Sequence, residues 1–228
     1  MASEPTKLLR RATILLLAVI LGVTAGCASR KPVSPKLSTI GDADLLALSD
    51  ALEALIDDGH DTPADREYAY EIARSHDEDA AAVLFARAVI TGRFVQSKGL
   101  LAAKLVTDIE RCARRSRELD PTFRAGAATR LLGTLYVMAP APLLAHGNSE
   151  TGIDLLEGLV EQRPDVVENH LRLAEAYIAL NDPDPARPHL CLCLAHQSQL
   201  RGDDQRLLAH LIADAGQPTC GQAAGDPQ

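Results

Sequence analysis

The side chains that could do chemistry in this chain include three that recur at helical spacing. His189, Cys193 and His196 stand at i, i+4 and i+7, so they would share one face of a helix and could ligate a metal ion there. No Cys-x-x-Cys pair accompanies them, and Cys193 suits the apolar core of a helix hairpin better. We therefore expect neither a metal site nor another cofactor.

The sequence lacks the motifs that would indicate an enzyme. It contains no nucleophile elbow, no P-loop, no dinucleotide fingerprint and no zincin helix. Its carboxylates are plentiful, but they are spread over helix faces, as solvation alone requires. The sequence therefore favours a binding protein over an enzyme.

Arg111, Arg114 and Arg115 form a local basic cluster at i, i+3 and i+4. Such a cluster could bind a carboxylate or a phosphate. The preferred interpretation is that it complements the C-terminal dipole of its own helix and pairs with Glu110 and Glu118.

Four cysteines follow residue 27, namely Cys112, Cys191, Cys193 and Cys220. Cys191 and Cys193 are about 200° apart around one helix, so they cannot form a disulfide with each other. Cys220, near the C-terminus, is a plausible partner for either. We prefer Cys191–Cys220 because Cys193 occupies a core position, but Cys193–Cys220 stays open. Cys112 lies on an apolar stripe and is expected to be a buried thiol.

The N-terminus has the pattern of an export signal. Lys7, Arg10 and Arg11 precede an apolar run over residues 12–23, and Thr24-Ala-Gly-Cys27 resembles a bacterial lipobox, although Thr24 replaces the usual Leu. The resemblance implies removal of residues 1–26 and attachment of diacylglycerol to Cys27. Ala28, by resemblance to lipoprotein sorting rules, favours an outer-membrane anchor that faces the periplasm. A plain secreted protein and an uncleaved anchor are the alternatives.

The charge balance excludes one class of partner. The expected leader holds three basic residues and one acidic residue, so the mature chain carries 20 Lys and Arg against 30 Asp and Glu. An acidic protein in the cell envelope is a poor ligand for nucleic acid. We expect membrane contact through the lipid anchor only.

Composition and periodicity indicate an all-α fold. The chain has no Trp and only three Phe, which leaves the core to Leu, Ala, Ile and Val. After a lipidated flexible tether at 27–41, a helical domain is expected over 42–216, with a disordered tail at 217–228. The expected helices are 45–56 with Asp42 as cap, 63–73 after Thr62, 79–92 ending at Gly92, 98–119, 122–138, 149–162, a pair within 167–194, and one from Asp203 to Gly216.

The stretch Val167–Leu194 carries the spacing of a tetratricopeptide (TPR) hairpin. With Val167 as position one, the pattern's positions are filled by Leu173, Ala174, Tyr177, Ala186, Leu190 and Cys193. Small residues at the two crossing positions let the helices approach closely. The chain therefore resembles a TPR-like α-solenoid of about four helix hairpins plus a C-terminal capping helix.

Residues 119–140 and Asn169–Tyr177, together with the long segment after Pro140, resemble the T-component (TatT) lipoproteins of TRAP transporters. The resemblance implies a lipid-anchored helical receptor associated with a periplasmic solute-binding protein. An envelope scaffold for outer-membrane or cell-wall assembly, with no solute, is the alternative.

In TPR hairpins the first helix of each repeat lines the concave face, so the resemblance nominates binding residues by position. They are Arg130, Leu131, Thr134, Val137, Glu168, Leu171, Arg172, Glu175 and Ile178. A mixed apolar and charged groove would suit a peptide segment or a small amphipathic acid. The alternative is that these side chains are merely solvated.

The segment 139–148 is about seven residues longer than a TPR turn. An apolar, proline-bearing insertion of this kind can form the lip of a binding site, or can simply pack over its hairpin.

Overall fold

The computed structural model describes residues 32–99, 104–216 and Cys220. The described helices belong to the second of two units into which the chain divides, Val33–Gln228. They are α2 (Pro35–Ile40), α3 (Leu45–Asp57), α4 (Pro63–Ala73), α5 (Ala81–Lys98), α6 (Val106–Leu119), α7 (Ala127–Met138), α8 (Ser149–Gln162), α9 (Val167–Ala179), α10 (Pro183–Ala195) and α11 (Gly202–Ala215). Short 3-10 turns occur at Phe123–Ala125, Ala141–Leu143 and Gln197–Gln199.

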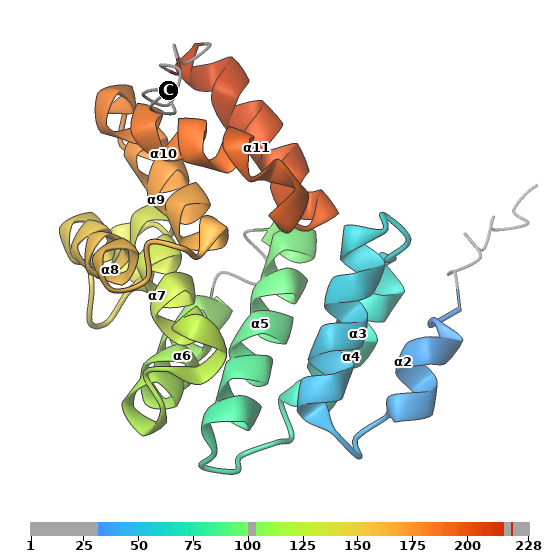
Figure 1. The fold of residues 1–228 in the computed structure, drawn as a ribbon. Coiled ribbons are helices and arrows are strands. Elements are labelled where there is room, and N and C mark those ends of the chain that lie inside the picture. The colour runs from blue at the N-terminus through green and yellow to red at the C-terminus, as the bar shows by residue number, and fades with distance from the viewer. Residues whose placement is uncertain (1–31, 100–103, 217–219, 221–228) are drawn as a thin grey trace, which may run out of the picture. The chain divides into compact units, whose positions relative to one another are not determined.

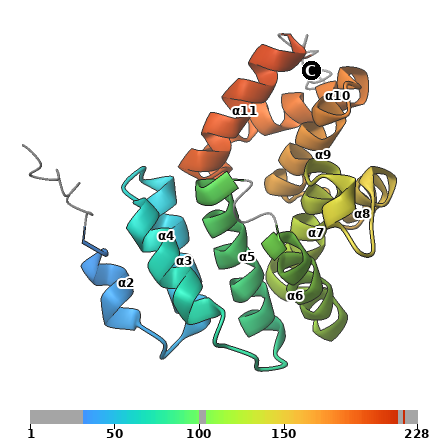
Figure 2. The ribbon, with the colours of Figure 1, turned by 180° about the vertical axis from the view of Figure 1, so that it is seen from behind.

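Helices that follow one another in the chain pack side by side. Extensive contacts join α5 to α6, α7 to α8 and α9 to α10, and α3 packs on α4 and α5. The two opposite views in Figures 1 and 2 show the helices arranged in chain order along a curve. The all-α, TPR-like solenoid of about four hairpins and a terminal helix is confirmed. Within the described ranges, no helix combines the length and the apolar character that crossing a bilayer requires.

Small residues bring α7 and α8 into close contact. A Cβ added at Gly133 would lie 2.6 Å from Cγ of Leu156, and one added at Gly152 would lie 2.8 Å from the carbonyl oxygen of Gly133. Both helices therefore need glycine at their crossing point, because a larger residue would push them apart. The small residues expected at TPR crossings have the same role.

The predicted tether is too long. Residues 33–40 belong to the folded unit, where α2 buries Leu37 completely against α3. The buried carboxylate of Asp65 fixes the start of this segment, since it accepts the Ser34 N–H at 2.7 Å. It also accepts the N–H of Thr62, the residue whose side chain caps α4. Apolar packing at Leu37 outweighs the prolines and serines that suggested flexibility. The predicted leader (1–26), the first part of the predicted tether (27–31) and most of the predicted tail (217–228) lie outside the described residues.

Several predicted helix ends were also wrong. Helix α5 does not stop at Gly92 but continues to Lys98, because packing of its other residues outweighs the cost of one helical glycine, about 1 kcal/mol. Helix α7 starts at Ala127 rather than Thr122, because Arg124, Ala125 and Gly126 all have positive φ. Asp44, not Asp42, caps α3 by accepting the Ala47 N–H.

The terminal helix α11 does more than cover the last repeat, because it also returns to α3. Oδ1 of Asp57, at the C-terminus of α3, accepts the Asp203 N–H in the first turn of α11 at 3.0 Å. In return, the Arg206 guanidinium donates to the carbonyl oxygens of Ile56 and Asp57. Each helix thus caps an end of the other, and α11 lies against the end of α3 near the start of the helical array (Figure 1).

We expect Asp57→Ala to lower the free energy of unfolding by about 1 kcal/mol, the usual effect of losing a helix N-cap acceptor. The effect is measurable by urea denaturation. Asp58→Ala is the matched control, because Asp58 is the exposed neighbour on the same helix end. Equal stability of the two variants would mean that the contact between α3 and α11 contributes nothing.

The cysteines take distinct roles. A disulfide joins Cys191 on α10 to Cys220 beyond α11, the pairing preferred from the sequence. Cys112 and Cys193 are buried free thiols, and burial raises the pKa of Cys112 to about 11 and that of Cys193 to about 12. Both free thiols are therefore protonated at neutral pH, as core residues.

Candidate functional site

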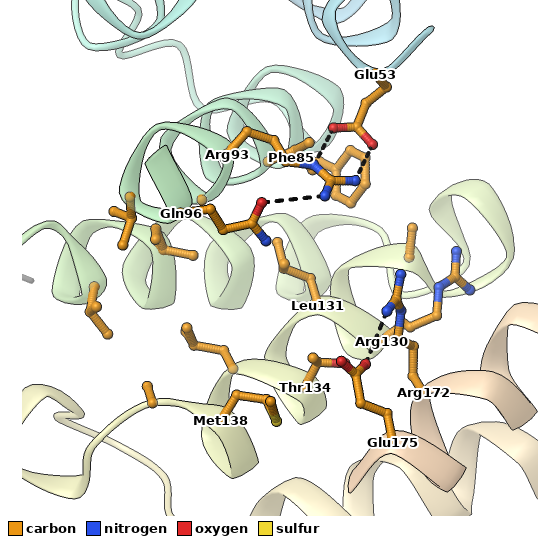
Figure 3. Close-up of a pocket in the computed structure, with 18 of the residues that line it drawn as sticks. Glu53, Phe85, Arg93, Gln96, Arg130, Leu131, Thr134, Met138, Arg172 and Glu175 are labelled. Atoms are coloured by element: carbon orange, nitrogen blue, oxygen red, sulfur yellow. Dashed lines mark hydrogen bonds and ion pairs between the residues drawn. The ribbon is translucent and has the colours of Figure 1, made fainter. Parts of the chain in front are cut away.

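A cavity of about 780 Å³ lies on the inner side of the helical array. Its walls come chiefly from α5, α7 and α9, with α3, α6, α11 and the segment after α7 completing it (Figure 3). Its size lies within the range of about 300–1,000 Å³ that small-molecule sites occupy.

Two helices supply the apolar walls through regular stripes. On α5, Phe85, Val89, Gly92, Arg93 and Gln96 line the cavity, and on α7 the lining residues are Ala127, Arg130, Leu131, Thr134, Leu135 and Met138. Both stripes follow the i, i+4, i+7 rule of a single helix face. Val106, Ile109 and Leu143 extend the apolar surface.

The long segment after α7 is held in place by a buried carboxylate. Glu110 on α6 is 1% exposed and accepts the N–H groups of Ala145 and His146, each at 2.8 Å. Burial, together with the charge of Glu110, raises the pKa of Tyr136 to about 12, and Gly147 packs directly against the Tyr136 ring. Ala139, Pro140 and Leu143 of the same segment line the cavity. The segment therefore both packs on its hairpin and forms one lip of the cavity.

Ion pairs form the polar end of the cavity. Arg93 pairs with Glu53 at 2.6 Å and with Asp203 at 3.1 Å, and Arg201 pairs with the same two carboxylates. Burial would raise the pKa of Asp203, but the charges of Arg201 and Arg93 lower it below its usual value. These contacts join α3, α5 and α11 around the cavity.

Arg172 on α9 forms the second set of ion pairs. Its guanidinium donates to Glu175 at 2.9 Å and to Asp204 of α11 at 2.5 Å. Burial would lower the pKa of Arg172, but the charges of Glu175 and Asp204 raise it. Burial raises the pKa of Asp204, although Arg172 opposes that shift.

Arg130 is the exception among the arginines of the cavity. It donates to Oδ1 of the buried Asn169 at 2.7 Å, and it forms no ion pair within the part of the chain that the structure describes. Burial lowers the pKa of Arg130, and the more distant Glu168 opposes that effect. Thr134, one turn further along α7, has a buried Oγ1 with no hydrogen-bond partner among the described residues.

The structure brings together six of the nine predicted binding residues. The six that line the cavity are Arg130, Leu131, Thr134, Glu168, Arg172 and Glu175. The other three, Val137, Leu171 and Ile178, were wrong. Leu171 is 0% exposed and, with Ile178, packs in the core where α11 covers α9, whereas Val137 packs beside Leu156 and Gly152 of α8.

Sequence reasoning missed the contributions of α3, α5 and α11, above all Glu53, Arg93, Arg201 and Asp204. The periodic stripe on α5 could have indicated this wall of the cavity. The helix was wrongly predicted to end at Gly92, however, so Arg93 was not assigned to it. No local signal pairs Glu53 with Arg201, because those residues are 148 positions apart.

Side chains of the predicted basic cluster and of the His189–Cys193–His196 motif contact other groups in the structure. Arg115 pairs with Asp79 and Glu118 and Arg111 with Asp108, whereas Glu110, an expected partner, binds the backbone of the long segment instead. His189 contacts His170, with 2.9 Å between their Nδ1 atoms, and the Cys193 thiol faces the Val167 carbonyl. Among the described residues, no cluster of three or more His, Cys, Asp or Glu could hold a metal.

Comparison with known proteins supports the repeat assignment. Residues 143–190 match the family model described as tetratricopeptide repeat, a stretch that includes α8, α9 and most of α10. No curated protein matches the sequence. Tetratricopeptide repeats serve as protein interaction modules, and TPR-like helical folds are typically non-catalytic.

Proposed function

We propose that this protein is a lipid-anchored adapter of the bacterial envelope, which resembles the TatT component of TRAP transport systems and engages a periplasmic solute-binding protein and its solute. The lipid is attached at Cys27, and the folded unit faces the periplasm from the outer membrane. Support for the anchor comes from the sequence, because Cys27 lies outside the described residues.

The observation that carries the proposal is the cavity. An open, shallow groove would suit a scaffold that binds only protein surfaces. Here, α3, α11 and the segment anchored by Glu110 border a half-open space of about 780 Å³ with apolar walls and a polar end. Such a cavity suits a small ligand better than a flat protein surface. Solute handling is therefore favoured over an envelope scaffold.

The partner is tested with purified proteins. The soluble Cys27→Ser protein should bind a TRAP solute-binding protein from the same organism, as measured by analytical ultracentrifugation, with an affinity that depends on whether solute is present. A Thr134→Phe variant, which fills the cavity, should lose the solute dependence. Failure to bind any TRAP solute-binding protein, together with capture of outer-membrane or cell-wall assembly proteins, would favour the scaffold.

The anchor gives a separate prediction. In cells fed radiolabelled palmitate, the wild-type protein should be labelled and found in the membrane fraction, whereas Cys27→Ser should carry no label. Cys112→Ser controls for labelling of another cysteine, because Cys112 is buried. Labelling of Cys27→Ser equal to that of the wild type would exclude lipidation at this position.

A further inference from the structure

Arg130 is the one arginine lining the described cavity whose charge is not matched by an ion pair. The carboxylates of Glu53 and Asp203 are engaged by Arg93 and Arg201, and those of Glu175 and Asp204 by Arg172. A guanidinium removed from water without a carboxylate partner is costly, and the amide oxygen of Asn169 compensates only in part. An anion entering the cavity would therefore find Arg130 without a competing ion pair.

Thr134 adds a hydrogen-bond donor on the same helix face. It follows Arg130 by four residues, so both side chains stand on the cavity side of α7, as Figure 3 shows. Its Oγ1 has no hydrogen-bond partner among the described residues, although it is buried. A carboxylate bound by Arg130 could accept a hydrogen bond from this hydroxyl with its second oxygen.

Apolar side chains line the cavity beside these two donors. Leu131, Leu135 and Met138 continue the stripe of α7, and Phe85 and Val89 line the opposite wall on α5. A ligand that satisfied both parts of the cavity would have one anionic end and an apolar body. Glu168 also lines the cavity near Arg130 and disfavours a second negative charge on the ligand.

We propose that the cavity binds an amphipathic monocarboxylate, whose carboxylate is held by Arg130 and Thr134 and whose apolar chain lies between α5 and α7. This proposal rests on the proposed function and names the class of solute. The solute's anionic end thus lies on α7, the helix that leads directly into the segment 139–148.

The proposal is tested by calorimetric titration of the Cys27→Ser protein with three probes below their micellar concentrations. Decanoate carries both features, decanol lacks the charge, and acetate lacks the chain. Decanoate should bind at least about 10-fold more tightly than decanol, the usual range for a charge-assisted hydrogen bond, and acetate should not bind measurably. Equal binding of decanoate and decanol would overturn the anionic subsite and leave the cavity as a purely apolar site.

Variants separate recognition from folding. Arg130→Gln should weaken decanoate binding about 10- to 100-fold and leave decanol binding nearly unchanged. Thr134→Val, which keeps the shape, should weaken decanoate binding only, by about 3- to 10-fold. Arg187→Gln, an exposed arginine paired with Asp184, is the control and should bind like the wild type. Equal losses for decanoate and decanol in Arg130→Gln would mean that Arg130 only supports the fold, and the proposal would fall.

The two proposals can fail separately. If decanoate fails to bind, the monocarboxylate inference is wrong. The proposed function would still stand if the purified protein bound a TRAP solute-binding protein in the experiment described above.

Discussion

Replacing Glu110 with alanine is expected to lower the free energy of unfolding by about 3 kcal/mol and to release the segment 139–148 from its hairpin. Glu110 is 1% exposed, and its two oxygens accept the N–H groups of Ala145 and His146. Without the carboxylate, both backbone donors lose a hydrogen bond to a charged group, which usually contributes about 1.5–3 kcal/mol. Glu110→Gln should rescue only part of this loss, because its amide group presents one acceptor oxygen instead of two.

The measurement combines urea denaturation with hydrogen exchange. The amides of Ala145 and His146 should exchange much faster in Glu110→Ala, whereas amides in α3 should keep their protection. Glu118→Ala is the control from the same helix, because Glu118 is exposed and its ion pair is with the exposed Arg115. Unchanged exchange at Ala145 and His146 would show that Glu110 does not anchor the segment.

Replacing Arg172 with alanine is expected to destabilise the fold by about 3 kcal/mol, because it leaves buried carboxylates without their cation. Asp204 is 6% exposed and forms its ion pair with Arg172, and Glu175 shares the same guanidinium. The contact also joins α9 to α11, so cooperativity of unfolding between these two helices should fall as well. Chemical denaturation of the variant measures both effects.

The loss in Arg172→Ala should depend on pH. Burial raises the pKa of Asp204, so its charged form opposes folding above that pKa, and protonation at lower pH removes the penalty. Without Arg172 the pKa should rise further. The deficit should therefore be smaller at about pH 5 than at about pH 8.

A double-mutant cycle identifies the unpaired group. Adding Asp204→Asn to Arg172→Ala should recover part of the lost stability, because it removes the buried charge. Arg187→Ala, on the exposed side of α10, should leave stability unchanged at either pH. A deficit independent of pH would mean that Asp204 is not the group left unpaired.

The helices themselves were largely predictable. Caps such as Thr62-Pro63 and apolar spacings such as Leu48, Leu52 and Ile56 are local signals, and they placed α3, α4, α8 and the hairpin at Val167 within a few residues. Boundaries failed where local signals competed with packing. Burial of Leu37 makes the proline-bearing α2 part of the fold, and α5 continues through Gly92.

The residues that line the cavity were predictable only where a helix meets the cavity with its regular face. The repeat positions on α7 and α9 selected Arg130, Thr134 and Arg172, which line the cavity. The same rule wrongly selected Leu171 and Ile178, because the rule assumes an open concave surface. Here α11 folds over that part of α9, so that Leu171 is buried and Ile178 is partly buried in the core cluster that α11 shares with α9 and α10.

The sequence alone therefore determined the helical class, the repeat spacing and the close crossings, since each depends on residues a few positions apart. Only the tertiary structure decided that α11 returns to α3, that Glu110 holds the segment 139–148, and that Arg130, beside Thr134, has no ion pair among the described residues. These features depend on which polar groups meet across separations of 35–146 residues along the chain. That choice is made by the packing of the whole array, because packing decides which arginines and carboxylates come within ion-pair distance.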